Sequence, residues 1–171
     1  MPLRFGRVFW LATYQACIHA IKKFKFERVY KLHTYLSDLV LKNLEDLETK
    51  YDCIALAPIN YESFIIRGFN HLELIFKSLS EKLACPIIQP FGKLKNKTQL
   101  SIYLTYNFDH ETLLFVDDVI TTGETFIRCL KVLPKTVKKV DSFFLSVSKP
   151  NVFNSAILRS RLIQSWQKRK F

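Results

Sequence analysis

The chain has 171 residues, of which 49% are hydrophobic, and it carries a formal net charge of +11. This length suits a single domain with a sizeable core, and the composition is that of a globular chain rather than a disordered one. No apolar run approaches the length of a membrane span, so no membrane insertion is expected. The positive charge favours anionic partners, namely phosphates, nucleic acid or an acidic membrane surface, without choosing between them.

The cysteine spacing argues against a metal site. The four cysteines are Cys17, Cys53, Cys85 and Cys129. They are too far apart to form a zinc half-site, so buried reduced thiols in a cytoplasmic protein are expected. A weak signal-peptide pattern at residues 8–20 is diluted by Tyr14 and His19.

Strands and helices are predicted to alternate along the chain. Apolar and β-branched runs predict strands at residues 8–14, 53–57, 86–91, 113–116 and 137–147. Helical periodicity and turn signals predict helices at residues 15–25, 28–47, 70–83, 121–133 and 154–167. Residues 92–112 are predicted to be irregular apart from a short helix near 99–104, and a loop of this length is usually functional.

This alternation indicates an α/β fold, with a parallel sheet flanked by helices on both faces. The whole chain, residues 1–171, is expected to be one domain. Residues 1–30 are expected to form a small hood over the carboxyl edge of the sheet, and residues 150–171 a basic C-terminal helix. Asn70 is expected to cap the helix that follows it.

Residues 113–125 end a buried strand and begin a helix. Backbone N–H groups at a helix N-terminus lack intrahelical partners and make an anion site. Gly123 lets the backbone approach a phosphate closely. The hydroxyls of Thr121, Thr122 and Thr125 can donate further hydrogen bonds. The segment therefore predicts a phosphate site at the helix start.

Two adjacent carboxylates, Asp117 and Asp118, end the same strand. Open α/β sheets bind ligands at the carboxyl ends of their strands. Carboxylates repel phosphate, but they accept hydrogen bonds from sugar hydroxyls and hold Mg²⁺ through water. Together with the phosphate site they predict a phosphorylated sugar as the ligand. The alternative is an ordinary strand, turn and Thr-capped helix without a ligand.

Residues 113–125 resemble the phosphoribosyl-pyrophosphate (PRPP) signature of type I phosphoribosyltransferases. The resemblance implies that Asp117 and Asp118 hold the ribose 2′- and 3′-hydroxyls, and that residues 121–125 cradle the 5′-phosphate. It also implies a pyrophosphate loop at residues 57–60. The implied PRPP-binding residues are Ala57, Pro58, Ile59, Asn60, Asp117, Asp118, Val119, Ile120, Thr121, Thr122, Gly123, Glu124 and Thr125.

From about residue 8 to 150 the chain is similar to the ComF-type competence family of phosphoribosyltransferase-like proteins. Arg67-Gly68-Phe69-Asn70 matches the family's Arg-Gly-Phe-Asn box, with His71 in place of the usual Gln. The resemblance implies a type I phosphoribosyltransferase fold, a role in DNA uptake for natural transformation, and other DNA-uptake proteins as partners.

Two departures limit what the resemblance implies. Many members begin with a four-cysteine zinc ribbon, which this sequence lacks, so no zinc is expected. The expected lid loop, residues 92–109, lacks the usual arginines, and lysine cannot reproduce arginine's bidentate grip. The implied lid residues are Lys93, Lys95, Lys97, Thr98 and Gln99.

If the chain is an enzyme, the resemblance implies displacement of pyrophosphate at the ribose anomeric carbon through an oxocarbenium-like transition state. Catalysis would rest on positioning and charge neutralisation by Asp117, Asp118 and Arg67. Mg²⁺, held indirectly by the two aspartates, would make the leaving group less basic. The alternative for Arg67 is a surface arginine at a helix start.

Two other functions stay open. One is a non-catalytic module that binds PRPP and single-stranded DNA, with aromatic side chains stacked on bases. The candidate aromatics, for which ordinary packing is the alternative, are Phe24, Phe26, Trp166 and Phe171. The other is a nucleobase-salvage phosphoribosyltransferase, for which no clear base-reading set is visible. The tail from Lys149 is basic and holds no acid, which fits a DNA contact or a solvated surface.

Overall fold

The core of the protein is a five-stranded parallel sheet. The structure, a computed structural model, describes residues 4–13, 19–24, 31–45, 49–95 and 100–148. The strand order is β1–β7–β6–β2–β3, and every neighbouring pair is parallel. The strands are β1 (Arg4–Thr13), β2 (Cys53–Leu56), β3 (Ile87–Ile88), β6 (Thr112–Ile120) and β7 (Lys139–Val147). The predicted α/β class with a parallel sheet is confirmed.

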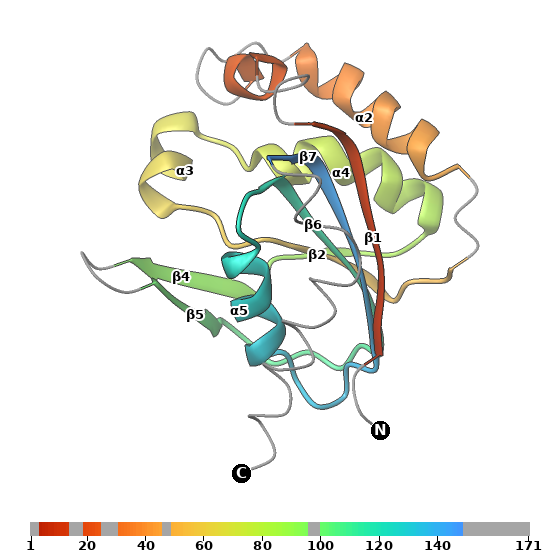
Figure 1. Cartoon of the computed structure of the whole chain (residues 1–171), viewed down its shortest axis with the longest axis vertical. Helices are drawn as coiled ribbons and strands as arrows, with labels where there is room; N and C mark the ends of the chain where they lie inside the picture. Colours follow the sequence, from red (N-terminus) through yellow and green to blue (C-terminus); the bar gives the residue numbers. More distant parts are fainter. Residues whose placement is uncertain (1–3, 14–18, 25–30, 46–48, 96–99, 149–171) are drawn as a thin grey trace.

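Helices cover both faces of this sheet (Figure 1). Helices α2 (Leu32–Asn43) and α4 (His71–Leu83) pack together on one face and α5 (Glu124–Val132) lies on the other, while α3 (Tyr61–Arg67) stands beside the sheet. Phe143 and Phe144 are consecutive in β7, so their side chains face opposite sides. Phe143 packs edge-on against Phe76 of α4, with ring centroids 5.8 Å apart, and Phe144 packs against Phe126 of α5 at 5.5 Å. No helix within the described ranges is long and apolar enough to cross a membrane.

The segment that was expected to be irregular contains a β-hairpin. β4 (Phe91–Lys95) and β5 (Leu100–Leu104) pair antiparallel, so the helix predicted near residues 99–104 is wrong. The alternation of buried and exposed side chains explains strand β5, because Ile102 is buried while the next residue, Tyr103, is exposed. The hairpin projects from the body beside α5 (Figure 1).

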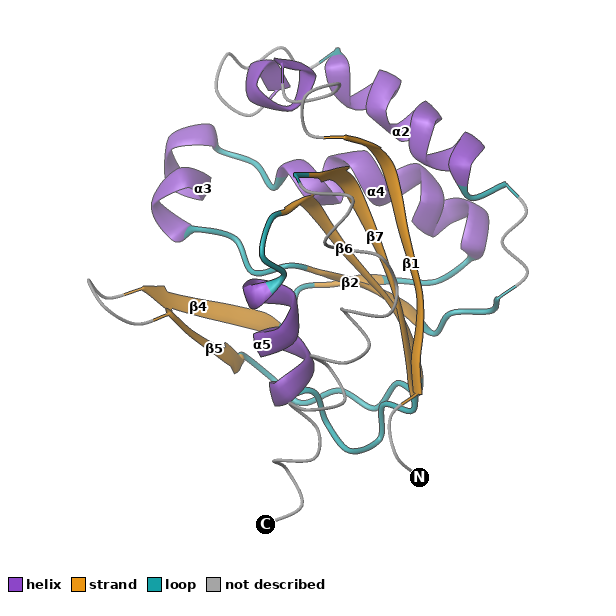
Figure 2. Cartoon of the chain, in the orientation of Figure 1, coloured by secondary structure: helices purple, strands orange, loops and turns teal. Residues whose placement is uncertain are grey.

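Residues 4–13 of the expected hood instead form β1, the edge strand that pairs with β7. Residues 19–24 are helical, and they lie with α2 beyond the end of β1 (Figure 2). Phe24 packs there against Phe69, with ring centroids 5.6 Å apart. The helix predicted at residues 154–167, with the basic tail, lies outside the described residues.

A buried carboxylate anchors the amino end of the sheet. Asp141 in β7 is 0% exposed. It accepts hydrogen bonds from the Tyr51 hydroxyl at 2.6 Å and from the Arg7 backbone N–H at 2.7 Å. The side-chain nitrogens of Arg7 and Lys139 lie 3.6 and 3.5 Å from its Oδ2. Because a buried charge is tolerated only when it is paired and hydrogen-bonded, this cluster ties β1 and β7 to the residue Tyr51 that precedes β2.

Tyr51 makes stability depend on pH. Burial raises the pKa of its hydroxyl, and Asp141 raises it further. The folded protein therefore keeps this proton at pH values where the unfolded chain, with an ordinary tyrosine pKa of about 10, loses it. We expect the free energy of unfolding to fall above about pH 10, by up to about 1.4 kcal/mol per pH unit from this group. Urea denaturation across this range measures the fall, and Tyr51→Phe should flatten it; equal slopes would contradict this assignment.

Candidate functional site

Two consecutive aspartates near the end of β6, Asp117 and Asp118, point to opposite faces of the sheet, as the two-residue period of a strand requires. Asp117 lies on the same face as Phe115, whose ring packs against Phe126 of α5 at 4.8 Å. Asp118 faces α4, where its Oδ2 lies 2.7 Å from Nε2 of His71, and it is 8% exposed. The expectation that both carboxylates face solvent is therefore wrong for Asp118, and its contact with a ribose hydroxyl stays a prediction.

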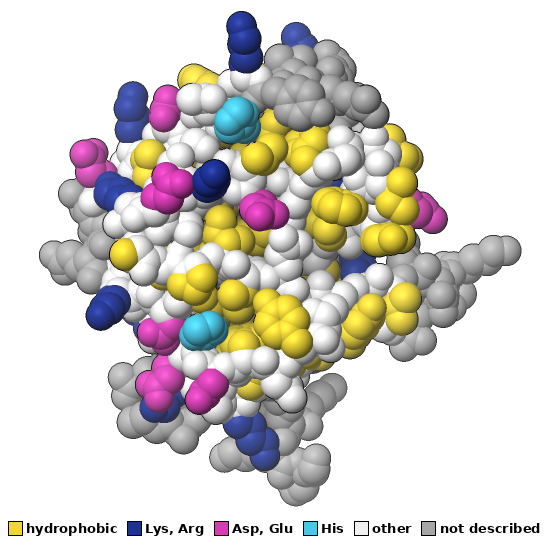
Figure 3. Space-filling model, turned by 180° about the vertical axis from the view of Figure 1, so that it is seen from behind, with side chains coloured by type: hydrophobic (Ala, Val, Ile, Leu, Met, Phe, Trp, Pro, Cys, Tyr) yellow, Lys and Arg dark blue, Asp and Glu magenta, His cyan; other side chains and the backbone are white. Residues whose placement is uncertain are grey.

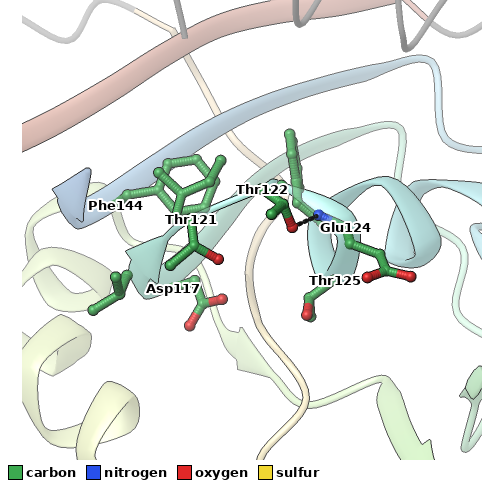
Figure 4. Close-up of a pocket in the computed structure, with 10 residues that line it drawn as sticks. Asp117, Thr121, Thr122, Glu124, Thr125 and Phe144 are labelled. Atoms are coloured by element: carbon green, nitrogen blue, oxygen red, sulfur yellow. Dashed lines mark hydrogen bonds between the residues drawn. The ribbon is translucent and has the colours of Figure 1, made fainter. Parts of the chain in front are cut away.

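The turn from β6 into α5 surrounds a small pocket of about 50 Å³. Its lining contains most of the expected signature residues: Asp117, Val119, Ile120, Thr121, Thr122, Gly123, Glu124 and Thr125. Figure 4 shows the side chains of Asp117 and Thr121 next to each other, with Thr122 and Thr125 on the helix side. The structure thus brings a carboxylate and three hydroxyls to one pocket.

Helix α5 begins directly at this pocket. Its N-cap residue, Gly123, has φ 74°, a left-handed conformation that side chains disfavour. The Thr122 hydroxyl accepts a hydrogen bond from the Glu124 N–H at 3.3 Å, and the Gly123 carbonyl accepts the first helical hydrogen bond from Ile127 at 2.9 Å. Because Gly123, Glu124 and Thr125 line the pocket, the positive end of the helix dipole lies against it.

Glu124 adds an acidic side chain beside the pocket, but its charge is paired. Its Oε1 accepts hydrogen bonds from Nη2 and Nε of Arg128 at 2.7 and 3.0 Å. Figure 4 shows the Glu124 carboxylate extending away from Asp117. A half-exposed ion pair of this kind contributes little to stability. Its consequence here is that the Glu124 charge is partly neutralised by Arg128.

The expected pyrophosphate loop, residues 57–60, lies next to Asp117. The register pairs Leu56 with Val116, and the Ala57 N–H donates to the Val116 carbonyl at 2.9 Å. Ala57 and Pro58 are buried, Ile59 is half-buried and Asn60 is exposed. The loop and the signature therefore share one edge of the sheet, although the loop residues do not line the pocket at α5.

A buried chain of side chains joins Arg67 to Asp118. Arg67 is the last residue of α3, and its Nη1 lies 3.2 Å from Nδ1 of His71. The other ring nitrogen of His71 contacts Asp118. Burial lowers the pKa of the Arg67 guanidinium, which nevertheless stays charged because arginine is not deprotonated in proteins. The alternative of a surface arginine is wrong, since Arg67 is only 9% exposed.

His71 is a site residue that carries no motif signal of its own. Asn70 caps α4 as predicted, because its Oδ1 accepts from the Leu72 N–H at 3.0 Å. His71 is therefore the first residue of a helix that packs on the sheet. The two-residue period of β6 could have indicated a polar partner on this helix, since one of two consecutive aspartates has to face the helices on the α4 side.

The β4–β5 hairpin carries the described part of the expected lid. Lys93 pairs with Ile102 and Lys95 with Leu100. Lys97, Thr98 and Gln99 lie outside the described residues. Burial raises the pKa of the Cys129 thiol in α5, Asp117 raises it further and Lys93 opposes the shift. Lys93 and Asp117 are therefore both within electrostatic range of the same residue.

The donor set at the pocket suits Mg²⁺ held through water. Among the described residues, no group of three or more His, Cys, Asp or Glu could hold a metal ion. Asp117 Oδ1 accepts from the Asp118 N–H at 2.8 Å, which fixes the orientation of this carboxylate. Mg²⁺ keeps most of its waters and is commonly held by one or two carboxylates together with ligand phosphates, so Asp117 is a candidate to hold it through water.

No protein-family model matches the sequence, and a comparison with curated proteins finds no match. Among solved structures, adenine phosphoribosyltransferase from Thermoanaerobacter pseudethanolicus is 18% identical, with a TM-score of 0.46 over 70% of this chain and 71% of that one. UMP synthase from Leishmania donovani is 18% identical, with a TM-score of 0.44 over 87% and 31%. Purine phosphoribosyltransferase from Pyrococcus horikoshii is 15% identical, with a TM-score of 0.39 over 84% and 89%.

Proposed function

We propose that this chain is a phosphoribosyltransferase-like protein that binds PRPP at the carboxyl edge of its sheet. The observation that supports the proposal is the pocket at the start of α5, which is lined by the first residues of that helix, by three threonines and by Asp117. At about 50 Å³ it is well below the roughly 300–1,000 Å³ of sites that enclose drug-sized ligands. It therefore suits one phosphate group, with the ribose hydroxyls at Asp117.

The diphosphate of PRPP would extend along the sheet edge toward residues 57–60. Arg67 ends the helix that follows this turn, so its positive charge is our candidate for neutralising the diphosphate. Mg²⁺, held through water by Asp117, would neutralise further charge on the same group. The β4–β5 hairpin, with Lys93, would close over the ligand and exclude water.

Calorimetry with PRPP and with ribose 5-phosphate, each with Mg²⁺, tests this proposal. We expect saturable binding of both ligands and tighter binding of PRPP, because only PRPP carries the diphosphate. Absence of binding to correctly folded protein would contradict the proposal. Release of pyrophosphate in the presence of an acceptor would establish turnover, and release with a free nucleobase would favour a salvage enzyme.

Gly123→Ala should weaken PRPP and ribose 5-phosphate equally, by about tenfold. The added side chain opposes the left-handed φ of 74°, so the free loop shifts to other conformations. Restoring the binding conformation then costs about 1–2 kcal/mol, and about 1.4 kcal/mol corresponds to a tenfold change in affinity. The matched control is Gly68→Ala, which has φ 77° with no atom within 4 Å of the new Cβ. It should lose stability without losing affinity for ribose 5-phosphate. If Gly123→Ala weakens the binding of PRPP but not of ribose 5-phosphate, the pocket holds the diphosphate, and the ligand is bound in the reverse orientation.

We further propose a ComF-type role in DNA uptake, with single-stranded DNA as a second ligand. The Arg67–Asn70 box and the net charge of +11 support this proposal. On the face seen in Figure 3, Lys and Arg side chains of the described residues are interspersed with Asp and Glu rather than gathered in a basic stripe. The basic tail, outside the described residues, is therefore the proposed DNA contact.

Neutralising the basic tail should weaken DNA binding and leave PRPP binding unchanged. The residues to replace with Gln are Arg159, Arg161, Lys168, Arg169 and Lys170. PRPP affinity should stay near that of the wild type, and single-stranded DNA binding should weaken. Each lost phosphate contact should lower the slope of log affinity against log salt by about 0.7. Fluorescence anisotropy in a salt series measures the slope. Equal slopes for wild type and variant would show that the tail is a solvated surface that does not contact DNA.

A further inference from the structure

Arg67, His71 and Asp118 form a buried bridge between three elements at the carboxyl edge of the sheet. Arg67 ends α3, His71 begins α4 and Asp118 lies near the end of β6. Their exposed fractions are 9%, 6% and 8%. A buried cation and a buried carboxylate need partners, and here one imidazole ring contacts both, at 3.2 Å from Arg67 and 2.7 Å from Asp118.

The chemistry of the two partners fixes the tautomer of the ring. A guanidinium can only donate, so Nδ1 of His71 has to accept from Arg67 and carries no proton. Nε2 then carries the ring proton and donates it to the Asp118 carboxylate, which accepts. The opposite tautomer would place two donors against each other at Arg67 and leave two acceptors facing each other at Asp118.

The bridge continues to the pocket. The Asp118 N–H donates to Asp117 Oδ1 at 2.8 Å, and Asp117 lines the pocket at α5. A continuous series of hydrogen bonds therefore runs from the guanidinium of Arg67, through His71 and Asp118, to the carboxylate of Asp117. Its first member lies on the proposed diphosphate side of the site and its last on the ribose side.

We infer that His71 is a positioning residue that couples the diphosphate and ribose halves of the site, by aligning Arg67 through Nδ1 and Asp118 through Nε2–H. This inference rests on the proposed PRPP site. It assigns His71 two separable tasks. Contact with Arg67 sets how much more tightly PRPP binds than ribose 5-phosphate. Contact with Asp118 sets the affinity for both ligands, because it orients the strand end that carries Asp117.

Two substitutions separate these tasks. In His71→Asn the amide oxygen can occupy the position of Nδ1 and accept from Arg67, but nothing reaches Asp118. In His71→Gln the amide nitrogen can occupy the position of Nε2 and donate to Asp118, but the acceptor beside Arg67 is lost. We expect His71→Gln to lower the ratio of PRPP affinity to ribose 5-phosphate affinity about tenfold. His71→Asn should weaken both ligands and keep the ratio of the wild type.

The experiment combines ligand titrations of wild type and both variants with a long-range ¹H–¹⁵N spectrum of the histidine rings in the ligand-free wild type. The spectrum should show His71 protonated at Nε2 alone. A proton on Nδ1, or one affinity ratio shared by all three proteins, would overturn the inference. If wild type binds neither ligand, the proposed function fails and the coupling role fails with it, while the spectrum still decides whether the bridge exists.

Discussion

Asp117→Asn should weaken Mg²⁺-dependent PRPP binding by about 100-fold and leave the melting temperature unchanged. Asp117 is the member of the aspartate pair that lines the pocket at α5, and the substitution removes its charge. Hydrogen bonds to charged groups contribute about 1.5–3 kcal/mol, and about 1.4 kcal/mol corresponds to tenfold in affinity. The fold should persist because the asparagine oxygen can still accept the Asp118 N–H that Asp117 Oδ1 accepts now.

Calorimetry and thermal unfolding on the same preparations measure both halves of this prediction. Asp38→Asn is the matched control, because Asp38 is exposed on α2 and outside the pocket. It removes the same charge from the protein and should leave PRPP affinity unchanged. Unaltered affinity in Asp117→Asn would remove Asp117 from the site. An equal loss of PRPP affinity in both variants would show that the effect comes from the overall charge of the protein and not from Asp117 itself.

Asp141→Ala should lower the free energy of unfolding by about 3 kcal/mol. The substitution leaves a buried donor, the Tyr51 hydroxyl, and a partly buried donor, the Arg7 N–H, without the acceptor that holds them at 2.6 and 2.7 Å. Each buried polar group without a partner costs about 1–3 kcal/mol. The side chains of Arg7 and Lys139 are 51% and 35% exposed, so water can replace Asp141 for them and they add little.

Urea denaturation measures this loss, with Asp38→Ala as a control because Asp38 is exposed on α2. Asp141→Asn should lose less than Asp141→Ala, because its amide oxygen still accepts one hydrogen bond. Equal stabilities of Asp141→Ala and Asp38→Ala would show that the cluster does not hold the amino end of the sheet. PRPP affinity of the folded Asp141→Ala protein should match wild type, because Asp141 lies at the opposite end of β7 from the site.

The strands and helices that were predicted correctly are those that their own sequence pattern marks. The central strand β2 is a continuous apolar run because both of its faces are buried, and it is buried at every position. β7 is buried at all but its first position, although Asp141, Ser142 and Ser146 interrupt its apolar sequence. The edge strand β1 was predicted as a strand near residues 8–14, but its place in the sheet was not, because its pairing with β7 joins Trp10 to Phe144, at the opposite end of the chain. The hairpin was missed because its alternation is weak: Lys93 and Lys95 interrupt the apolar pattern of β4.

The residues of the candidate site were likewise predictable only where a local sequence pattern marks them. Residues 117–125 are contiguous, so their spacing alone predicts a carboxylate and a phosphate site a few residues apart. The orientation of Asp118 follows from the strand period. Its contact with His71 spans 47 residues of sequence, and it depends on how α4 packs over β6, which no local pattern specifies.

The most direct test of the central claim is a ¹H–¹⁵N NMR titration of the protein with ribose 5-phosphate, followed residue by residue. The claim is that the N-terminus of α5 binds the 5′-phosphate of the sugar. The account predicts that the largest shifts fall on the backbone amides of Thr122, Gly123, Glu124 and Thr125, which line the pocket, and that inorganic phosphate shifts the same amides more weakly. Saturable shifts elsewhere, with these four amides unmoved, would contradict it.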